Sequence, residues 1–246
     1  MNHSDNDSAG LKPETRARLM HVSTATLATL LFKRGLKNQF IQNVSRLSTA
    51  NQNMVGPAFT LRYMPAREDR NGIEVFRNRE HPQRQAIEQC PAGAVMVIDS
   101  RKDARAASAG GILVGRLKQR GVAGVVTDGG FRDSSEIATL GIAAYHQRPS
   151  APTNLTLHEA IDINVPIGCG DAPVFPGDVM VGDADGVIVI PAEIADDVAI
   201  EAADMTVFED FVTISVKQGK SILGLYPPTD PQTLTDFEAW KKEHGF

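Results

Sequence analysis

The spacing of apolar residues changes several times along the chain, and each change predicts a different element. From Pro13 to Gly35 the apolar residues recur at helical intervals, and proline is well tolerated in the first turn of a helix. Residues 55–63 (VGPAFTLRY) have the composition of a strand. We therefore expect the chain to begin with helical structure and then to enter a sheet.

The next segment, residues 64–85, interrupts this apolar pattern. It is charged and rich in turn-forming residues, so we expect it to lie on the surface. It contains five arginines, which are Arg67, Arg70, Arg77, Arg79 and Arg84. Two interpretations remain open: the segment is a solvated loop, or it forms a basic rim that attracts an anionic substrate.

The middle of the chain has the clearest pattern. Residues 94–99 (AVMVID) and 122–128 (VAGVVTD) are apolar runs that each end in an acid, which is typical of buried strands. Between them lie a turn rich in Ser, Ala and Gly at residues 106–111 and a segment with helical character at residues 112–120. A strand, a helix and a second strand in this order predict a βαβ unit with a parallel pair.

The last third predicts short strands followed by helices. Residues 183–186 (DADG) separate two apolar runs and are typical of a hairpin turn. Residues 192 to about 217 have an apolar helical face, and a short final helix carries Trp240.

These elements predict an α/β fold with helical extensions at both ends. We expect residues 1–12 to be a disordered arm, because they offer little to bury, and residues 13–246 to form one domain. Within that domain the core covers about residues 22–191, and the C-terminal helices cover about residues 192–246.

Composition and charge narrow the classes of function. The 246 residues carry 25 Lys and Arg against 30 Asp and Glu, a net charge of −5, which argues against a nucleic-acid binder. Cys90 and Cys169 form no CxxC pair, so we expect reduced thiols. The polar N-terminus and the lack of a long apolar run favour a cytoplasmic protein that neither enters a membrane nor is secreted.

The strongest candidate for chemistry is the segment of residues 128–133 (DGGFRD), which directly follows an expected strand. Loops at the carboxyl ends of parallel strands tend to carry function. Arg132 offers a fork of donors suited to a carboxylate, and Asp133 offers oxygens suited to Mg²⁺ or Mn²⁺. The alternative interpretation is an ordinary turn with a local ion pair.

A second candidate is the small-residue loop of residues 106–113 (AASAGGIL), which leads into the expected helix. Free backbone N–H groups at the start of a helix favour an anion. The loop is neither a Walker motif nor GxGxxG, so an ordinary Gly–Gly turn remains the alternative. Because both loops follow successive parallel strands, we expect them to lie side by side.

These residues also carry a resemblance. Residues 110–133 (GGILVGRLKQRGVAGVVTDGGFRD) and 164–191 (NVPIGCGDAPVFPGDVMVGDADGVIVIP) resemble the RraA-like family, and the likeness covers about residues 22–191. That family includes 4-hydroxy-4-methyl-2-oxoglutarate/4-carboxy-4-hydroxy-2-oxoadipate aldolases with oxaloacetate decarboxylase activity, and regulators of ribonuclease E activity. Residues 221–230 (SILGLYPPTD) resemble a longer subgroup that often bears the regulator name.

The resemblance implies a swivelling β/β/α domain that assembles as a trimer or a dimer of trimers, with sites near subunit contacts. It implies that Arg132 binds substrate and that Asp133 holds a divalent metal, Mg²⁺ or Mn²⁺, with waters completing the shell. It further implies that the substrate carboxylate is bound by the backbone N–H groups of Gly110, Gly111, Ile112 and Leu113.

Three functions remain open at this point. The first is a metal-dependent lyase that releases pyruvate from a 2-oxo acid; Asp133 favours it, because regulators in the family can lack this residue. The second is a non-catalytic regulator that binds a ribonuclease, and the third is a dehydratase of 2-oxo-3-deoxy sugar acids. The aldolases of the family commonly have an acidic residue where this chain has Gly111. We therefore expect the base that removes the 4-hydroxyl proton of the substrate to be a metal-bound water or Asp128.

Overall fold

The computed structural model describes residues 10–49 and 53–245. Of the arm expected to be disordered, residues 1–9 lie outside the described residues. Leu11 is 9% exposed and packs in a cluster with residues of the first two helices and of the long C-terminal helix. Lys12 forms an ion pair with Asp196.

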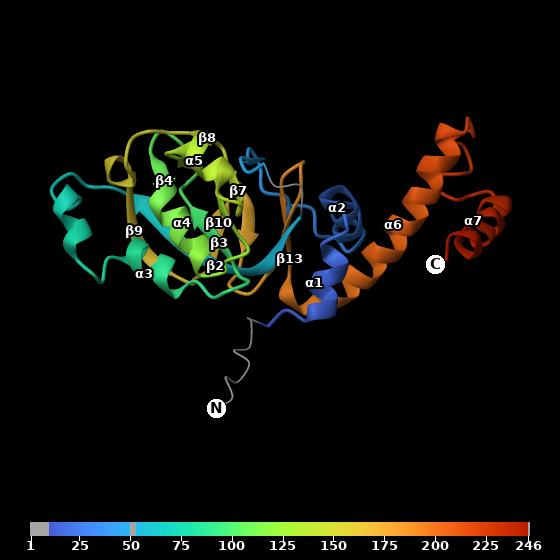
Figure 1. The fold of residues 1–246 in the computed structure, drawn as a ribbon, viewed down its shortest axis with the longest axis horizontal. Helices are drawn as coiled ribbons and strands as arrows, with labels where there is room; N and C mark the ends of the chain where they lie inside the picture. Colours follow the sequence, from blue (N-terminus) through green and yellow to red (C-terminus); the bar gives the residue numbers. More distant parts are fainter. Residues whose placement is uncertain (1–9, 50–52, 246) are drawn as a thin grey trace, which may run out of the picture.

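Eight strands form the central sheet (Figure 1). Across its path they are β1 (Ser45–Arg46), β7 (Ala143–His146), β5 (Gly124–Thr127), β3 (Val95–Asp99), β2 (Met54–Pro65), β12 (Val179–Gly182) and β13 (Val187–Ile190), and β9 (His158–Ile163) pairs with β2. The four strands from β7 to β2 are parallel, and the remaining pairs are antiparallel. The α/β class expected from the sequence is confirmed.

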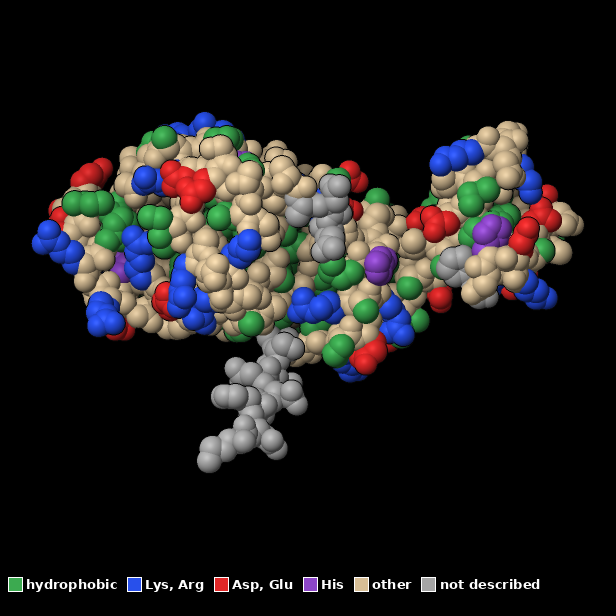
Figure 2. Space-filling model, in the orientation of Figure 1, with side chains coloured by type: hydrophobic (Ala, Val, Ile, Leu, Met, Phe, Trp, Pro, Cys, Tyr) green, Lys and Arg blue, Asp and Glu red, His purple; other side chains and the backbone are tan. Residues whose placement is uncertain are grey.

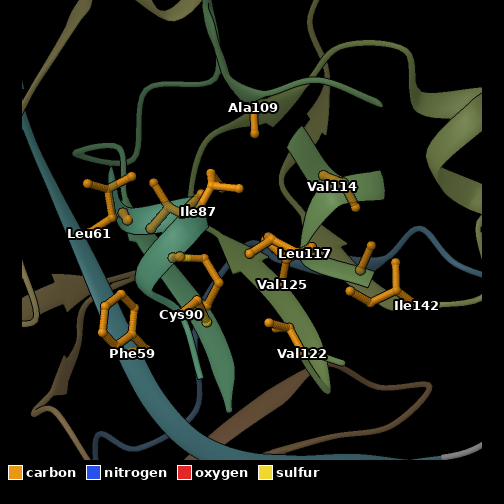
Figure 3. Packing of buried hydrophobic residues seen from close by; sticks show 14 of the residues in the cluster. Phe59, Leu61, Ile87, Cys90, Ala109, Val114, Leu117, Val122, Val125 and Ile142 are labelled. Carbon is orange, nitrogen blue, oxygen red and sulfur yellow. The ribbon is translucent and has the colours of Figure 1, made fainter. Parts of the chain in front are cut away.

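The parallel pair of β3 and β5 confirms the predicted βαβ unit, with α4 (Gly111–Gln119) between the two strands. Together with α3 (Pro82–Gln89), α4 packs its apolar side chains on one face of the sheet (Figure 3). There Leu117 and Val114 belong to the same cluster as Leu61 and Val125 of the strands. Both faces of β3 are covered, which explains why its sequence is apolar without alternation.

The opposite face of the sheet is covered by a hairpin of β10 (Ile167–Cys169) and β11 (Ala172–Val174). Cys169 lies in this second cluster, while Cys90 lies in the first. Both cysteines are buried free thiols.

The N-terminal helical stretch is divided in two. α1 (Pro13–Leu19) begins at the expected proline, and α2 (Thr24–Lys33) ends just before Gly35. The division arises at Ser23, whose hydroxyl accepts a hydrogen bond from the Thr26 N–H at 3.0 Å and so caps a new helix. A cap of this kind lies within the helical apolar spacing, so the spacing alone did not reveal the break.

The C-terminal helices form an arm that leads away from the sheet (Figure 1). α6 (Ala195–Lys217) carries the chain outward, and α7 (Pro231–His244) packs back on α6 through an aromatic cluster. That cluster includes Phe211 and Trp240. Among the residues that the structure describes, none of the helices combines the length and apolarity needed to span a bilayer.

Asp128, at the carboxyl end of β5, ties three backbone segments together. Its buried carboxylate accepts hydrogen bonds from the N–H groups of Ser100 at 2.7 Å, Lys102 at 3.1 Å and Gly170 at 3.2 Å. Burial is the main cause that raises its pKa to about 6, since the backbone donors act in the opposite direction. This carboxyl group therefore fixes the loop that follows β3.

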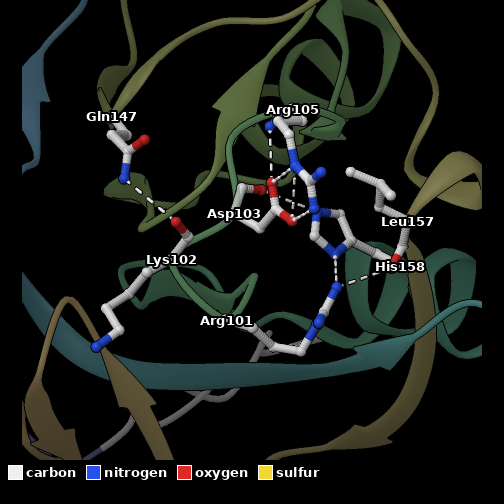
Figure 4. Close-up of polar contacts among 7 residues, drawn as sticks. All are labelled: Arg101, Lys102, Asp103, Arg105, Gln147, Leu157 and His158. Atoms are coloured by element: carbon white, nitrogen blue, oxygen red, sulfur yellow. Dashed lines mark hydrogen bonds and ion pairs between the residues drawn. The ribbon is translucent and has the colours of Figure 1, made fainter.

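A buried histidine holds the same loop from its other side (Figure 4). His158 Nδ1 lies 3.1 Å from an Arg101 guanidinium nitrogen, and Nε2 lies 3.0 Å from the Asp103 carbonyl oxygen. Because arginine can only donate, Nδ1 accepts and Nε2 carries the proton, which defines a neutral imidazole. Burial lowers the pKa of His158 in agreement with this state. The histidine is thus a structural support for the loop rather than a metal ligand.

The hairpin between β12 and β13 confirms the predicted turn and also anchors α2. The Asp183 carboxylate accepts hydrogen bonds from the Thr24 N–H at 2.7 Å, the Thr24 hydroxyl at 2.9 Å and the Asp185 N–H at 2.9 Å. We predict that Asp183→Ala lowers the free energy of unfolding by about 2 kcal/mol, because it leaves these donors unpaired. Urea unfolding measures the effect. The exposed neighbour substitution Asp185→Ala serves as control, and an equal loss in both variants would contradict the assignment.

The raised pKa of Asp128 predicts a pH dependence of stability. The folded state keeps the proton up to about pH 6, whereas the unfolded chain loses it near its ordinary value of 3.8, so this group stabilises the fold less as pH rises from 4 to 6. The shift corresponds to about 3 kcal/mol. Urea unfolding of wild type and Asp128→Asn across this range should show a smaller decline in the variant. Parallel curves would contradict the prediction.

Candidate functional site

The two candidate loops lie side by side, as the sequence predicted. β4 (Ala107–Ala109) pairs in parallel with β6 (Gly130–Phe131), which in turn pairs with β8 (Arg148–Pro149). Gly110 follows β4 and precedes α4, while Arg132 and Asp133 follow β6 and precede α5 (Ser134–Thr139). The small sheet therefore brings the glycine loop against the Arg–Asp pair.

The two loops are so close that a side chain at Gly110 has no room. A Cβ atom there would lie 2.7 Å from Arg132 Cγ and 2.8 Å from Asp133 Oδ2. Asp133 has a left-handed backbone with φ 56° and ψ 38°, which is uncommon for a residue other than glycine. Its Oδ2 accepts a hydrogen bond from the Gly111 N–H at 3.1 Å and lies 3.5 Å from Arg132 Nε.

Glu136 is a site residue that the sequence analysis missed. A Cβ atom at Gly111 would lie 2.6 Å from Glu136 Oε2, so this carboxylate occupies the space next to the glycine. Position 111 carries no acid, but a carboxylate from α5 lies beside it. No local pattern in the sequence indicated it, because the Glu136 carboxylate reaches Gly111 only through the packing of α5 against α4.

Part of this arrangement lines a cavity of about 160 Å³, whose wall does not include Gly111 or Glu136. Arg132 and Asp133 lie at its wall with Gly110, Ile112 and Leu113. The Ile112 side chain is 86% exposed. Other elements add Phe76, Gln83, Arg84, Ala107, Ala109, Thr153 and Asn154.

Residues 64–85 contribute directly to this cavity. After β2 the segment forms a short 3-10 helix, η1 (Ile73–Arg77), and then enters α3. Of its five arginines, Arg84 lines the cavity and lies 4.4 Å from the centre of the Phe76 ring. Lys and Arg side chains also gather on the surface over α3 and α4 (Figure 2). One arginine of the segment thus reaches the cavity, while the other four lie outside its wall.

The structure does not bring Asp128 to the cavity wall with Arg132 and Asp133. Its two carboxylate oxygens are engaged by three backbone N–H groups, as described above. An oxygen already in such bonds is poorly placed to take a proton from a substrate. The role of Asp128 that the geometry supports is to fix the loop between β3 and β4.

The donor set fits a hard divalent cation that keeps several waters. Asp133 and Glu136 provide carboxylate oxygens, the ligands that Mg²⁺ and Mn²⁺ prefer, and both side chains are exposed to solvent. Within residues 10–49 and 53–245 the structure contains no cluster of three or more His, Cys, Asp or Glu side chains arranged for a metal. Only an ion that needs one or two protein ligands would suit this site.

Comparison with known proteins shows the family to which the chain belongs. The family model RraA-like, described as Aldolase/RraA, matches residues 23–189. A protein of Halalkalibacterium halodurans is 35% identical over 57% of this chain and 61% of its own length, and one of Burkholderia mallei is 37% identical over 43% and 64%. Both carry the name "Putative 4-hydroxy-4-methyl-2-oxoglutarate aldolase". In each case less than two thirds of the relative is matched.

Solved structures share the fold. Streptomyces coelicolor RraAS2, described as an unusual member of the RNase ES inhibitor RraA protein family, has a TM-score of 0.72 at 28% identity, covering 82% of this chain and 96% of its own. An RNA-processing inhibitor RraA from Thermus thermophilis has a TM-score of 0.52 at 22% identity, covering 70% and 94%. The family model spans well over half of the sequence, and the chain belongs to the RraA-like family.

Proposed function

We propose that this protein is a divalent-metal-dependent lyase that releases pyruvate from a 2-oxo acid. One observation carries the proposal: a single cavity is lined by Arg132, Asp133 and the glycine loop at the start of α4. The names of the relatives support an aldolase of 4-hydroxy-2-oxo acids. The same enolate chemistry would also serve the decarboxylation of oxaloacetate. We further propose that the protein assembles as a trimer or a dimer of trimers.

The chain's own groups can bind the 2-oxo acid end of such a substrate. Two of the four backbone N–H groups expected to bind the carboxylate already donate hydrogen bonds within the chain. The Gly111 N–H donates to the Asp133 carboxylate, and the Leu113 N–H donates to the Gly110 carbonyl oxygen. The Ile112 N–H, in the first turn of α4, is directed along a helix axis whose dipole favours an anion. With the Arg132 guanidinium it would hold the carboxylate.

Bond cleavage requires a proton acceptor and a way to stabilise negative charge. Removal of the 4-hydroxyl proton lets the C3–C4 bond break, and C4 leaves as a carbonyl compound. The electron pair of that bond moves to the 2-oxo group as an enolate, which then takes a proton at C3 to give pyruvate. A divalent cation held by Asp133 and Glu136 would supply Lewis-acid polarisation of the 2-oxo group. Arg132, at the cavity wall, would stabilise the developing charge. Glu136, beside Gly111, supplies the acidic group that position 111 lacks.

A second function has one observation in its favour. The structural neighbour from Streptomyces coelicolor is described as a member of a ribonuclease-inhibitor family and is 28% identical to this chain. A non-catalytic regulator would need no metal-binding carboxylate at a cavity, so Asp133 at the cavity wall favours the lyase. Binding of a purified ribonuclease that is unchanged by Asp133→Ala, together with no lyase activity, would favour the regulator.

We predict that the protein releases pyruvate from oxaloacetate and from 4-hydroxy-2-oxoglutarate when Mg²⁺ is present, and that EDTA abolishes the release. Asp133→Ala and Arg132→Met should each lower kcat by about 100-fold or more, because each removes a group that acts on the developing charge. Coupled oxidation of NADH by lactate dehydrogenase measures the pyruvate formed.

Asp185→Asn is the matched control, since it removes an exposed carboxylate from the β12–β13 turn, outside the cavity wall. It should keep the wild-type rate. Turnover that is insensitive to EDTA, or equal in Asp133→Ala and wild type, would refute the proposed lyase.

A further inference from the structure

Arg84 is a cation on the cavity wall for which residues 10–49 and 53–245 supply no counter-ion. Its guanidinium lies 4.4 Å from the Phe76 ring centre, and it takes part in no ion pair with any carboxylate in the described part of the chain. Partial burial lowers its pKa, as expected for a cation removed from water without a partner. By contrast Arg67, on the same segment, pairs with Asp69 at 2.6 Å.

Gln83, the adjacent residue, also lines the cavity and carries an acceptor without a hydrogen-bond partner. Its side chain is 98% buried, and Nε2 donates to the Tyr63 hydroxyl and to the Ser108 carbonyl oxygen, both at 2.9 Å. Because a carbonyl oxygen can only accept, the contact with Ser108 fixes which end of the amide carries the N–H groups. Oε1 is left buried with no donor.

Arg84 and Gln83 together suit a ligand that carries both an acceptor for the guanidinium and a donor for Gln83 Oε1. A planar guanidinium held against an aromatic ring suits a carboxylate, which it can bind through two parallel hydrogen bonds. An acceptor such as Gln83 Oε1 needs a hydroxyl or another donor next to that carboxylate. A carbon that bears both a hydroxyl and a carboxylate satisfies both.

We infer that Arg84 and Gln83 form a specificity subsite for the end of the substrate remote from the 2-oxo acid. Arg84 binds the distal carboxylate, Gln83 accepts a hydrogen bond from the neighbouring hydroxyl, and Phe76 holds the guanidinium in place. The inference rests on the proposed function and deepens it, because it assigns the residues that select a 4-hydroxy-2-oxo diacid over a monoacid.

The test compares two substrates that differ only at this end: 4-hydroxy-2-oxoglutarate, with a distal carboxylate, and 4-hydroxy-2-oxopentanoate, with a methyl group. The wild type should prefer the diacid in kcat/KM. Arg84→Met should lower kcat/KM for the diacid at least about 30-fold, mainly through KM, because a buried charge pair is lost. The value for the monoacid should change less than about twofold.

Arg77→Met is the matched control, since Arg77 is an exposed arginine of the same segment outside the cavity wall. It should leave both substrates unchanged. Arg84→Lys keeps the charge without the planar fork and should fall between wild type and Arg84→Met. An equal loss for both substrates in Arg84→Met, or no preference in the wild type, would overturn the inference.

Measuring the binding of 2-oxo acids that are not cleaved distinguishes a failure of this inference from a failure of the proposed function. Calorimetric titrations in Mg²⁺ use 2-oxoglutarate and 2-oxopentanoate, which cannot undergo the cleavage. Selective weakening of 2-oxoglutarate in Arg84→Met supports the subsite even if neither hydroxy acid is turned over, in which case only the lyase fails. Equal affinity of wild type and Arg84→Met for 2-oxoglutarate would overturn the subsite even if pyruvate is released.

Discussion

The candidate site depends on two positions that have no space for a Cβ atom. At Gly110 that space is taken by Arg132 and Asp133, and at Gly111 it is taken by the Glu136 carboxylate. The stem of Arg132 and both carboxylates approach the start of α4 where these two residues carry no side chain. The left-handed backbone of Asp133 belongs to the same arrangement, since its carboxylate turns back to accept from the Gly111 N–H.

Rigid neighbours hold this close approach in place. The short parallel pairing of β4 with β6 aligns the two loops, and Asp128 and His158 fix the loop that leads from β3 into β4. Both of these residues are titratable and buried, yet their hydrogen bonds go to the backbone or to a structural arginine. Asp128 and His158 therefore support the loops, whereas Arg132 and Asp133 line the cavity. The position of these residues in the sequence does not by itself distinguish the two roles.

The sequence predicted the parallel β3–α4–β5 unit and the adjacency of residues 106–113 and 128–133, because buried runs and small-residue turns fix those features locally. It did not separate the surroundings of Asp128 from those of Asp133, because both lie in the short segment of residues 128–133 and only the backbone amides around Asp128 distinguish them. Glu136 was missed for a related reason. Its proximity to Gly111 comes from packing α5 against α4, a contact between helices that no local pattern encodes.

The same core that positions the reacting groups also positions the distal end of the cavity. α3 buries Gln83, Ala86 and Ile87 on one face, at the spacing that places residues on the same side of a helix, and these last two pack in the cluster that contains Val114 of α4. Arg84 comes one residue after Gln83, so its stem leaves that face and reaches the cavity wall. Residues 64–85 have no regular apolar pattern, but they end in the well-packed helix α3, which gives the charge of Arg84 a defined position. A chain of net charge −5 can therefore still carry positive charge at the wall of its cavity.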